Sequence, residues 1–205
     1  MAQIYRITHY KNLPHILEHG LHCPNANIQD PDFVPIGFPT LIAHRNEREV
    51  PLPPGGNLSH YIPFYFSVKS PMLYVITQAN DPEVIPTPQR EIIYLVSSFE
   101  KLQQNNCTFV FTDRHAQLNY THFYNQPTDI NLLNWDVIKS SQWGRQYGVD
   151  KIEIKQAECL VHNFMPSDSL LGIACKDEEM FTFVNEQVLT KQKKITVKIK
   201  PDWYF

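Results

Sequence analysis

The stretch KIEIKQAECLV, residues 151–161, decides which fold we expect, because β-favouring residues surround a single carboxylate there. Apolar and polar residues alternate along it, which is typical of a strand with one buried face. The pattern predicts a strand over IKQAECLV, residues 154–161, with Glu158 between Ala157 and Cys159. Such an acid either faces water at a sheet edge or serves chemistry, and the stretch alone leaves both explanations open.

Outward from this stretch, expected strands and helices follow one another along the chain. Further strands are expected at residues 3–8, 60–68, 91–98, 107–113, 170–176 and 193–205. Helices are expected at residues 11–20, 40–50, 70–78, 131–143 and 178–190, and one more is expected to begin near Arg114. The sum predicts an α+β fold in one domain, residues 1–205, with a mixed β core and flanking helices.

Proline-rich connections are a main feature of the chain. The chain has sixteen prolines against seven glycines, and half of the prolines lie at residues 24–40 and 51–63, which predicts long, rigid and irregular loops there. The first loop, PNANIQDPDFVPIGFP, is too rich in turn-forming residues for regular structure and is expected to cover a ligand. LPPGGNL, residues 52–58, lacks the spacing of a phosphate loop and is interpreted as a turn.

Composition argues against several classes of protein. No apolar run approaches the ~18 residues that a membrane span needs, and the N-terminus lacks signal-peptide features, so we expect a cytoplasmic protein without a membrane partner. The scattered cysteines contain no C-x-x-C pair and are interpreted as reduced core residues: Cys23, Cys107, Cys159 and Cys175. A net charge of −3 gives no bulk attraction to nucleic acid, so any nucleic-acid site has to be a local patch.

Two motifs have competing explanations. HILEH, residues 15–19, matches a zinc-peptidase pattern in which His15 and His19 share a helical face. No third ligand on a second helix is evident, so we expect no metal and interpret the pair as a solvated helical face. KQKKITVKIK, residues 191–200, either contacts phosphates or forms the exposed side of an edge strand, where lysine also discourages aggregation.

Two aromatic stretches, residues 63–74 and 111–125, combine rings with cations. Their notable side chains are Tyr65, Phe66, Met72, Tyr74, Arg114, His115, Tyr120 and His122. Stacking on an unpaired base requires such a combination, but a β-rich core also requires aromatic residues. Composition favours core packing for the rings and leaves Arg114 and His115 open.

Six strings of the chain, taken in order, resemble the DarT family, bacterial toxins that ADP-ribosylate bases of single-stranded DNA. They are IYRITHYKNLPHILEHGL, LIAHRNEREVPLPPGG, YIPFYFSVKSPMLY, FVFTDRHA, KQAECLV and PDWYF. The resemblance runs from the first expected strand to the last residue, which makes it more specific than any single short motif. It implies an ADP-ribosyltransferase fold, NAD as the donor, and a macrodomain antitoxin, DarG, that reverses the modification.

The resemblance also gives the acid of the opening stretch a role. In the family the glutamate of the QAE strand is the catalytic acid, and Glu158 matches it. Departure of nicotinamide generates an oxocarbenium-like ribose, which a nearby carboxylate stabilises. Arg45 matches the family arginine that acts on the base; Arg48 is its nearest competitor, but the adjacent Asn46 favours Arg45. Because a guanidinium stays protonated, its expected role is to stabilise the anion of a thymine that has lost its imide proton.

Further residues are implied on both sides of the site. The expected NAD side comprises Arg6, Thr8, His9, Asn12 and Tyr65. The expected DNA side comprises Arg45, Met72, Tyr74, Arg114 and His115. The role of Arg6 is open, because this position is histidine in some relatives. Three alternatives remain: transfer to guanine, whose amine needs no deprotonation, a non-catalytic single-strand-binding domain, and a zinc peptidase.

Overall fold

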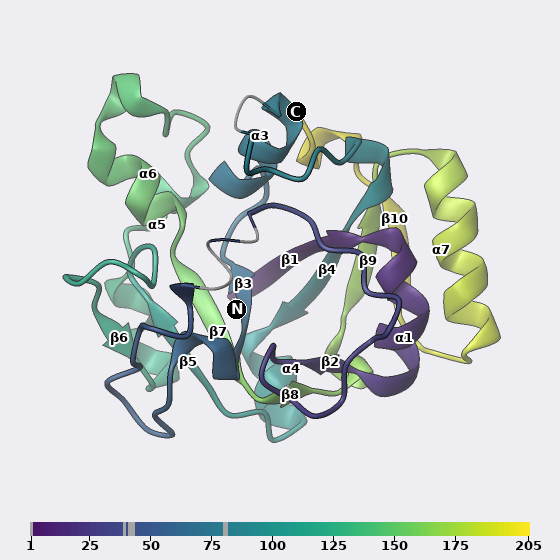
Figure 1. The fold of residues 1–205 in the computed structure, drawn as a ribbon, viewed down its shortest axis with the longest axis horizontal. Helices are drawn as coiled ribbons and strands as arrows, with labels where there is room; N and C mark the ends of the chain where they lie inside the picture. Colours follow the sequence, from purple (N-terminus) through teal and green to yellow (C-terminus); the bar gives the residue numbers. More distant parts are fainter. Residues whose placement is uncertain (1, 39, 41–43, 80–81) are drawn as a thin grey trace.

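One mixed eight-stranded sheet organises the chain, of which the computed structural model describes residues 2–38, 40, 44–79 and 82–205. The strand order is β10-β9-β4-β1-β3-β7-β5-β6 (Figure 1). The strands are β1 (Gln3–His9), β3 (Tyr61–Tyr65), β4 (Ile92–Ser98), β5 (Phe109–Thr112), β6 (Phe123–Tyr124), β7 (Glu158–His162), β9 (Gly172–Cys175) and β10 (Thr196–Ile199). Neighbours pair antiparallel, except that β9 and β10 run parallel. β2 (Leu21–His22) and β8 (Phe164–Met165) form a separate short pair.

Helices cover both ends of this sheet. They are α1 (Leu13–His19), α3 (Pro71–Gln78), α4 (Phe99–Gln104), α5 (Trp135–Lys139), α6 (Val149–Lys155) and α7 (Glu178–Thr190). Short 3-10 turns are η1 (Tyr10–Asn12), η2 (Leu58–His60), η3 (Gln89–Glu91), η4 (Pro127–Leu132), η5 (Arg145–Tyr147), η6 (Ser167–Ser169) and η7 (Pro201–Trp203). α1 and α7 lie at the β10 end, whereas α5 and α6 lie at the opposite end (Figure 1). None of the helices in the described ranges is long and apolar enough to cross a membrane.

Local signals set several element ends where the sequence predicted them. Ser70 caps α3 by accepting a hydrogen bond from the backbone N–H of Leu73, and α7 occupies the predicted range 178–190. α1 stops at Gly20, whose φ of +80° favours glycine and whose added Cβ would lie 2.7 Å from the carbonyl oxygen of Met165. β10 is an edge strand, as one of the two explanations of the lysine-rich segment required.

The helix expected near Arg114 is wrong. After β5 the chain makes turns from residue 113 to 122 and returns as β6. The carboxylate of Asp113 accepts from the backbone N–H of His122 at 3.1 Å, and the hydroxyl of Thr112 donates to the carbonyl of Arg114 at 2.7 Å. These side chains satisfy the backbone locally, so they compete with helix formation.

The strand expected over residues 154–161 is wrong in its first half. The range 149–155 forms α6, and β7 begins only at Glu158. The ammonium of Lys155 is buried and donates to the carbonyls of Ile138 and Ser140 at 2.6 and 3.0 Å. Contacts with α5 therefore decide this segment, because a segment this short gives too few residues for periodicity to separate a helix from a strand.

Other differences are smaller. The helix expected at 131–143 is limited to α5, the strand expected at 193–205 is limited to β10 and followed by η7, and α4 was not predicted. Of the helix expected at 40–50, Thr40 and His44 are helical, residues 41–43 lie outside the described residues, and 45–47 form a turn. The remaining predicted strands and helices are present within a few residues of their expected ends.

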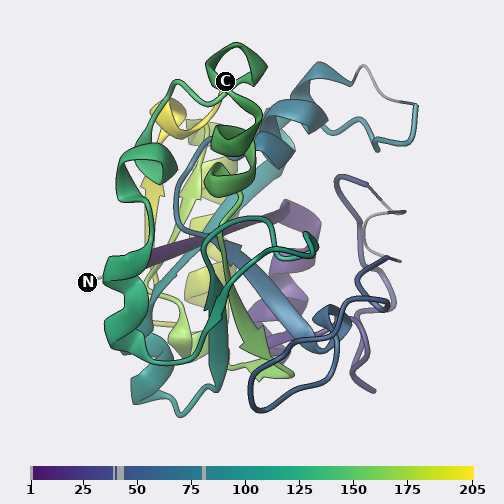
Figure 2. The ribbon, with the colours of Figure 1, turned by 90° about the vertical axis from the view of Figure 1, so that its left-hand side faces the viewer.

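The two faces of the sheet are covered differently. In side view, the segments 24–38 and 44–57 lie on one side, and η4 and α5 lie on the other (Figure 2). Along β7, Cys159 and Val161 pack into the largest apolar cluster, whereas Leu160 packs with Val50 under the loop segments. Because side chains alternate along a strand, Glu158 shares the face of Leu160 and points beneath the loops, not to a solvated sheet edge.

Candidate active site

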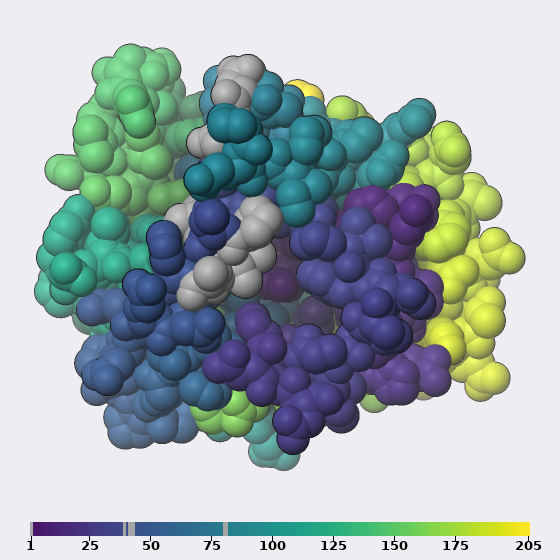
Figure 3. Space-filling model, viewed as in Figure 1, coloured from purple at the N-terminus to yellow at the C-terminus, as the bar shows by residue number. Residues whose placement is uncertain are grey.

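A pocket lies where the loop segments cross β1, β3 and β7, and the space-filling view shows a hollow at this place (Figure 3). It is lined by Arg6, Ile7, Thr8, Phe33, Pro35, Ile36, Phe38, Arg45, Pro63, Tyr65, Met72, His115, Gln117 and Glu158. Its cavity volume is about 160 Å³. Because a protein cavity of about 150 Å³ holds benzene, this pocket has room for one six-membered ring.

Glu158 and Arg45 meet in this pocket. Glu158 is only 2% exposed, and its Oε2 accepts from Nη1 of Arg45 at 3.2 Å. Register places Glu158 opposite Tyr65 on the neighbouring strand β3. A buried carboxylate is retained in charged form only where partners compensate its desolvation, and the arginine supplies the opposite charge. The acid that the sequence singled out is therefore a buried, paired group.

The other oxygen of Glu158 is held by backbone. Its Oε1 accepts from the backbone N–H of Ala116 at 3.2 Å, in the turn segment that follows β5. The backbone N–H of Glu158 donates to the hydroxyl of Thr112 at 3.0 Å. His115 Nε2 lies 4.0 Å from the same Oε1. The side chain and the backbone of Glu158 are thus both hydrogen-bonded to the segment 112–116.

The charges around the pocket favour an electron-rich ligand. Burial and the neighbouring Arg45 cation lower the pKa of Arg6 from 12.5 to about 10, so Arg6 stays charged at neutral pH. Burial lowers the pKa of His115 below 6.5, and the Glu158 carboxylate offsets only part of this. Burial and the charge of Glu158 raise the pKa of Tyr65 above 10. Two fixed cations therefore accompany one carboxylate, with a neutral imidazole and phenol.

Several buried guanidinium nitrogens in the pocket lack acceptors. Among the described residues, Nε and Nη2 of Arg45 and Nε of Arg6 have no hydrogen-bond partner. Buried polar groups are nearly always paired, so unpaired donors facing a pocket indicate a site for acceptor groups of a ligand. Carbonyl, phosphate and hydroxyl oxygens all meet this description.

The expected NAD residues fall into two groups. Arg6, Thr8 and Tyr65 line the pocket, whereas His9 and Asn12 do not. His9 packs its ring on Tyr10 and contacts Glu91 Oε2 at 3.1 Å. The structure thus places His9 in a buried contact and not among the residues that line the pocket.

Asn12 ties the loop over the pocket to α1. Its Nδ2 donates to the carbonyl of Val34 at 2.9 Å and to the hydroxyl of Thr8 at 3.0 Å. Its Oδ1 accepts from the backbone N–H of Val34 at 2.8 Å. Phe33 and Pro35, the neighbours of Val34, line the pocket. The amide therefore positions the loop that the sequence expected to cover a ligand.

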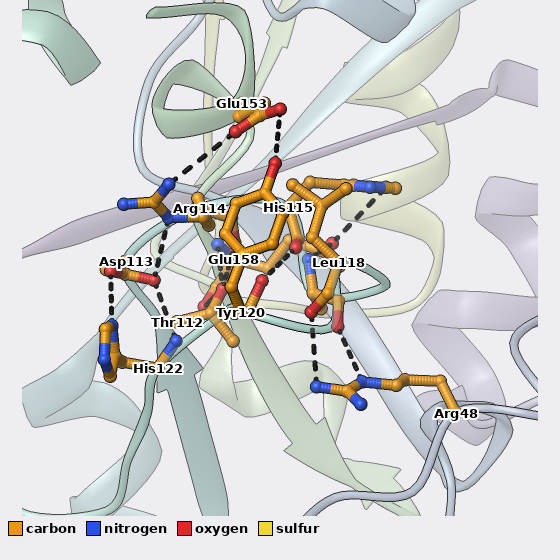
Figure 4. Close-up of polar contacts among 12 residues, drawn as sticks. Arg48, Thr112, Asp113, Arg114, His115, Leu118, Tyr120, His122, Glu153 and Glu158 are labelled. Carbon is orange, nitrogen blue, oxygen red and sulfur yellow. Dashed lines mark hydrogen bonds and ion pairs between the residues drawn. The ribbon is translucent and has the colours of Figure 1, made fainter. Parts of the chain in front are cut away.

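The expected DNA residues are also divided. Met72 and His115 line the pocket beside Arg45. Tyr74 is 42% exposed and lies in an edge-to-face cluster with Trp143 and Phe205 outside the pocket. Arg114 lies near Asp113 and Glu153 and packs over the ring of Tyr120 (Figure 4). Tyr74 and Arg114 are thus outside the cavity itself.

The competitor Arg48 does not reach the carboxylate. It donates from Nε and Nη2 to the carbonyls of Ala116 and Leu118, at 3.4 and 3.2 Å (Figure 4). Its guanidinium also lies over the ring of Phe123. Of the two arginines in HRNER, Arg45 is the one in contact with Glu158. This geometry agrees with the preference for Arg45 that the sequence suggested.

The histidine pair of HILEH is partly solvated. The rings of His15 and His19 lie 4.5 Å apart on α1. Glu18 pairs with Lys191 of the α7 end. Within the described ranges, no group of three or more histidine, cysteine or acidic residues is arranged to hold a metal ion. The four cysteines are free thiols, and Cys23, Cys159 and Cys175 are buried as expected.

Some site features escaped sequence reasoning. The apolar wall of Phe33, Pro35, Ile36 and Phe38 was expected only as an unspecified covering loop. The backbone N–H of Ala116 was missed, although FVFTDRHA was among the strings that carried the resemblance. A backbone donor leaves no mark in a sequence, because every residue except proline has one.

The family model described as "ssDNA thymidine ADP-ribosyltransferase, DarT" matches residues 5–205. This chain belongs to the DarT family. A DNA ADP-ribosyl transferase of Escherichia coli O127:H6 is 35% identical over 205 residues, which is 100% of this chain and 94% of that protein. DarT membership confirms the fold and the enzyme class that the sequence predicted, those of the DNA ADP-ribosyltransferases.

Solved DarT structures agree with this fold. Thermus sp. 2.9 DarT in complex with ADP-ribosylated ssDNA superposes with a TM-score of 0.92 at 34% identity, covering 100% of this chain and 96% of that one. The same protein in complex with NAD+ gives a TM-score of 0.88, with 100% and 98% covered. A Thermosipho africanus relative, 23% identical over 99% of this chain and 49% of its own length, is named a DNA ADP-ribosyl transferase-DNA ADP-ribosyl glycohydrolase fusion protein.

Proposed function

We propose that residues 1–205 act as a single domain that transfers ADP-ribose from NAD to a thymine of single-stranded DNA. The bond between C1′ of the ribose and the nicotinamide nitrogen breaks, and its electron pair leaves with neutral nicotinamide. The imide nitrogen of thymine supplies the pair for the new bond to C1′, and the imide proton passes to solvent. No general acid has to protonate the leaving group, because nicotinamide is cationic before the bond breaks.

The single observation that supports this proposal most is the buried pair of Arg45 and Glu158 in one pocket. A carboxylate beside the reacting ribose stabilises the positive charge that develops at C1′. The same guanidinium that binds Glu158 retains Nε and Nη2 without partners among the described residues. These donors suit the carbonyl oxygens of a thymine whose ring becomes anionic as it attacks.

NAD is expected on the β1 side of the pocket. Tyr65 and Thr8 offer a ring face and a hydroxyl to the nicotinamide riboside, and Arg6 offers a charged donor. The cavity of about 160 Å³ suits the nicotinamide ring. The assignment of His9 and Asn12 to NAD binding remains a proposal, with Asn12 acting through the loop that it holds.

DNA is expected on the side of Arg45. Met72 and His115 suit the target base, one as a packing surface and one as a neutral hydrogen-bonding ring. Tyr74 and Arg114 are proposed to act farther along the strand, since they lie outside the cavity. An unpaired base is the accessible substrate because a duplex buries the imide edge in base pairing. Thymine is favoured over guanine because a thymine must form an anion before it attacks, and the neighbouring Arg45 cation stabilises that anion. A guanine amine attacks without forming an anion, so it would need no such cation.

The partners follow from the same proposal. A DarG-like macrodomain antitoxin that removes the modification is expected, and the Thermosipho fusion, in which a transferase and a glycohydrolase share one chain, supports such a pairing. We place this toxin in the cytoplasm, where NAD and single-stranded DNA meet, and propose no membrane partner and no metal.

Mass spectrometry of mixed-sequence oligonucleotides after incubation with NAD tests the proposal. The expected product carries one added ADP-ribose on thymine, with release of nicotinamide. The same sequence in a stable duplex should accept little, whereas equal labelling of both forms would contradict the single-strand assignment. Labelling on guanine would show the alternative acceptor. Oligonucleotide binding with intact NAD would instead indicate a non-catalytic single-strand-binding domain.

A further inference from the structure

The turn segment Asp113–His122 carries a backbone N–H that donates to the carboxylate of Glu158. The peptide between His115 and Ala116 is held at both ends: Thr121 Oγ1 donates to the carbonyl of His115 at 2.6 Å, and the N–H of Ala116 donates to Glu158 at 3.2 Å. The orientation of this one peptide therefore fixes Oε1 of the carboxylate.

Arg48 binds the same turn through its side chain. Its planar guanidinium spans the carbonyls of Ala116 and Leu118, so it binds the peptide directly after the one that holds Glu158 (Figure 4). Two parallel donors on one plane set the direction of the bound groups as well as their position. The face of the guanidinium lies 5.7 Å from the ring centroid of Phe123, at the end of the turn.

The backbone of Arg48 is itself held in place by hydrogen bonds and packing within the segment 48–58. Its carbonyl accepts from the N–H of Leu58 at 2.9 Å, and Val50 donates from its N–H to the carbonyl of Gly56 at 2.8 Å. Val50, Leu58 and Ala116 are fully or nearly fully buried in one apolar cluster. The segment 48–58 and the turn are thus joined by packing as well as by the arginine.

We propose that Arg48 is a positioning residue for Glu158, acting through the backbone N–H of Ala116. One short turn of the chain then controls both carboxylate oxygens: Arg45 binds Oε2 directly, and Arg48, three residues later, fixes the donor to Oε1. Because Glu158 faces the reacting ribose, its placement governs the chemical step and not the capture of DNA. This inference rests on the proposed transfer reaction.

The rival role of Arg48 is a phosphate contact, since its side chain is half-buried and borders an open depression with His44 and Gln117. The two roles separate in steady-state kinetics. A positioning role predicts that Arg48→Ala lowers kcat at saturating oligonucleotide, on the order of tenfold to a hundredfold, with little change in KM for oligonucleotide. A phosphate contact predicts a raised KM with kcat retained.

The experiment compares wild type, Arg48→Ala, Arg48→Lys and two controls. Lysine should restore only part of kcat, because one ammonium does not span both carbonyls as the fork does. Tyr120→Phe removes the hydroxyl that donates to Glu153 at 2.7 Å, a side-chain contact of the same turn that involves neither Ala116 nor Glu158, and should leave kcat near wild type. Arg90→Ala removes a charge from exposed η3 and should have no effect.

Hydrogen exchange at the Ala116 amide provides a readout besides activity. The exchange rate of this amide should be higher in Arg48→Ala than in wild type, and it should be unchanged in Tyr120→Phe. A raised KM alone, an unchanged Ala116 exchange rate, or an equal loss of kcat in Tyr120→Phe would each overturn the inference. If wild type modifies no DNA, the proposed function fails, yet the exchange rates still decide whether Arg48 controls the Ala116 amide.

Discussion

Arg45 and Glu158 are 113 positions apart in sequence, yet Nη1 of the arginine donates to Oε2 of the glutamate across 3.2 Å. The pair joins the segment before β3 to the first residue of β7, and both residues line the pocket. The two members of the pair have different expected tasks. In the proposed reaction Glu158 stabilises the ribose cation, whereas Arg45 stabilises the base anion, so substitutions at the two sites should differ in their pH behaviour.

Glu158→Gln should lower single-turnover transfer by about a hundredfold to a thousandfold, because removing one preorganised electrostatic group commonly costs this much. The amide keeps the size of the side chain, so oligonucleotide binding should stay close to wild type. Nicotinamide release measured under saturating NAD checks this. Glu186→Gln, at an exposed position of α7, is the matched control and should be fully active. Wild-type turnover by Glu158→Gln would remove this residue from the mechanism.

Arg45→Ala should lose most transfer to thymine, and the deficit should shrink as pH rises. The cation lowers the effective pKa of the imide, so without it more hydroxide is needed to form the same anion. Arg45→Lys keeps the charge but loses the planar fork and should recover only part of the rate. Single-turnover rates, measured across a pH series on thymine-only and guanine-only oligonucleotides, test this prediction. A guanine acceptor should show no rescue at high pH.

Asn12→Ala should raise KM for NAD more than it lowers kcat. The substitution removes both hydrogen bonds to the backbone of Val34, and this releases the loop that carries Phe33 and Pro35 over the pocket. Initial rates over a range of NAD concentrations check the prediction. Gln29→Ala is the control, because the amide of Gln29 binds only carbonyls at the start of the same loop. An equal rise in KM for both variants would show a general loss of loop order.

His115 should make the folded state sensitive to acid. Its folded pKa is lowered below the ordinary 6.5 by burial. Above pH 6.5 both states are neutral at this site and its contribution to stability is complete. As pH falls below 6.5, the unfolded state binds the proton first, so the free energy of unfolding decreases down to the folded pKa.

Urea unfolding at a series of pH values between 5 and 7.5 tests the role of His115. The loss of stability on acidification should be smaller in His115→Gln than in wild type. His122→Gln, at a side chain that is 71% exposed, should retain the wild-type pH dependence. An identical pH dependence in His115→Gln and wild type would show that another group titrates.

The sequence alone determined the elements whose signals are local. α7 occupies the range 178–190 that the sequence predicted, and α1 ends within its predicted range 11–20, at Gly20. Glu158 was singled out because one carboxylate stood in an apolar strand, and the ordered strings added its family role. Each of these signals is contained in a few neighbouring residues, so no distant contact was needed to interpret them.

Only the tertiary structure decided the remaining features. Lys155 binds the carbonyls at the end of α5, and this contact converts an apparent strand into α6. The turns after Thr112 replace an expected helix and bring the N–H of Ala116 to Glu158. Register between β3 and β7 places the acid in the pocket, where Arg45 meets it. Contacts between residues far apart in sequence depend on strand pairing and loop packing, and local propensity contains no information about either.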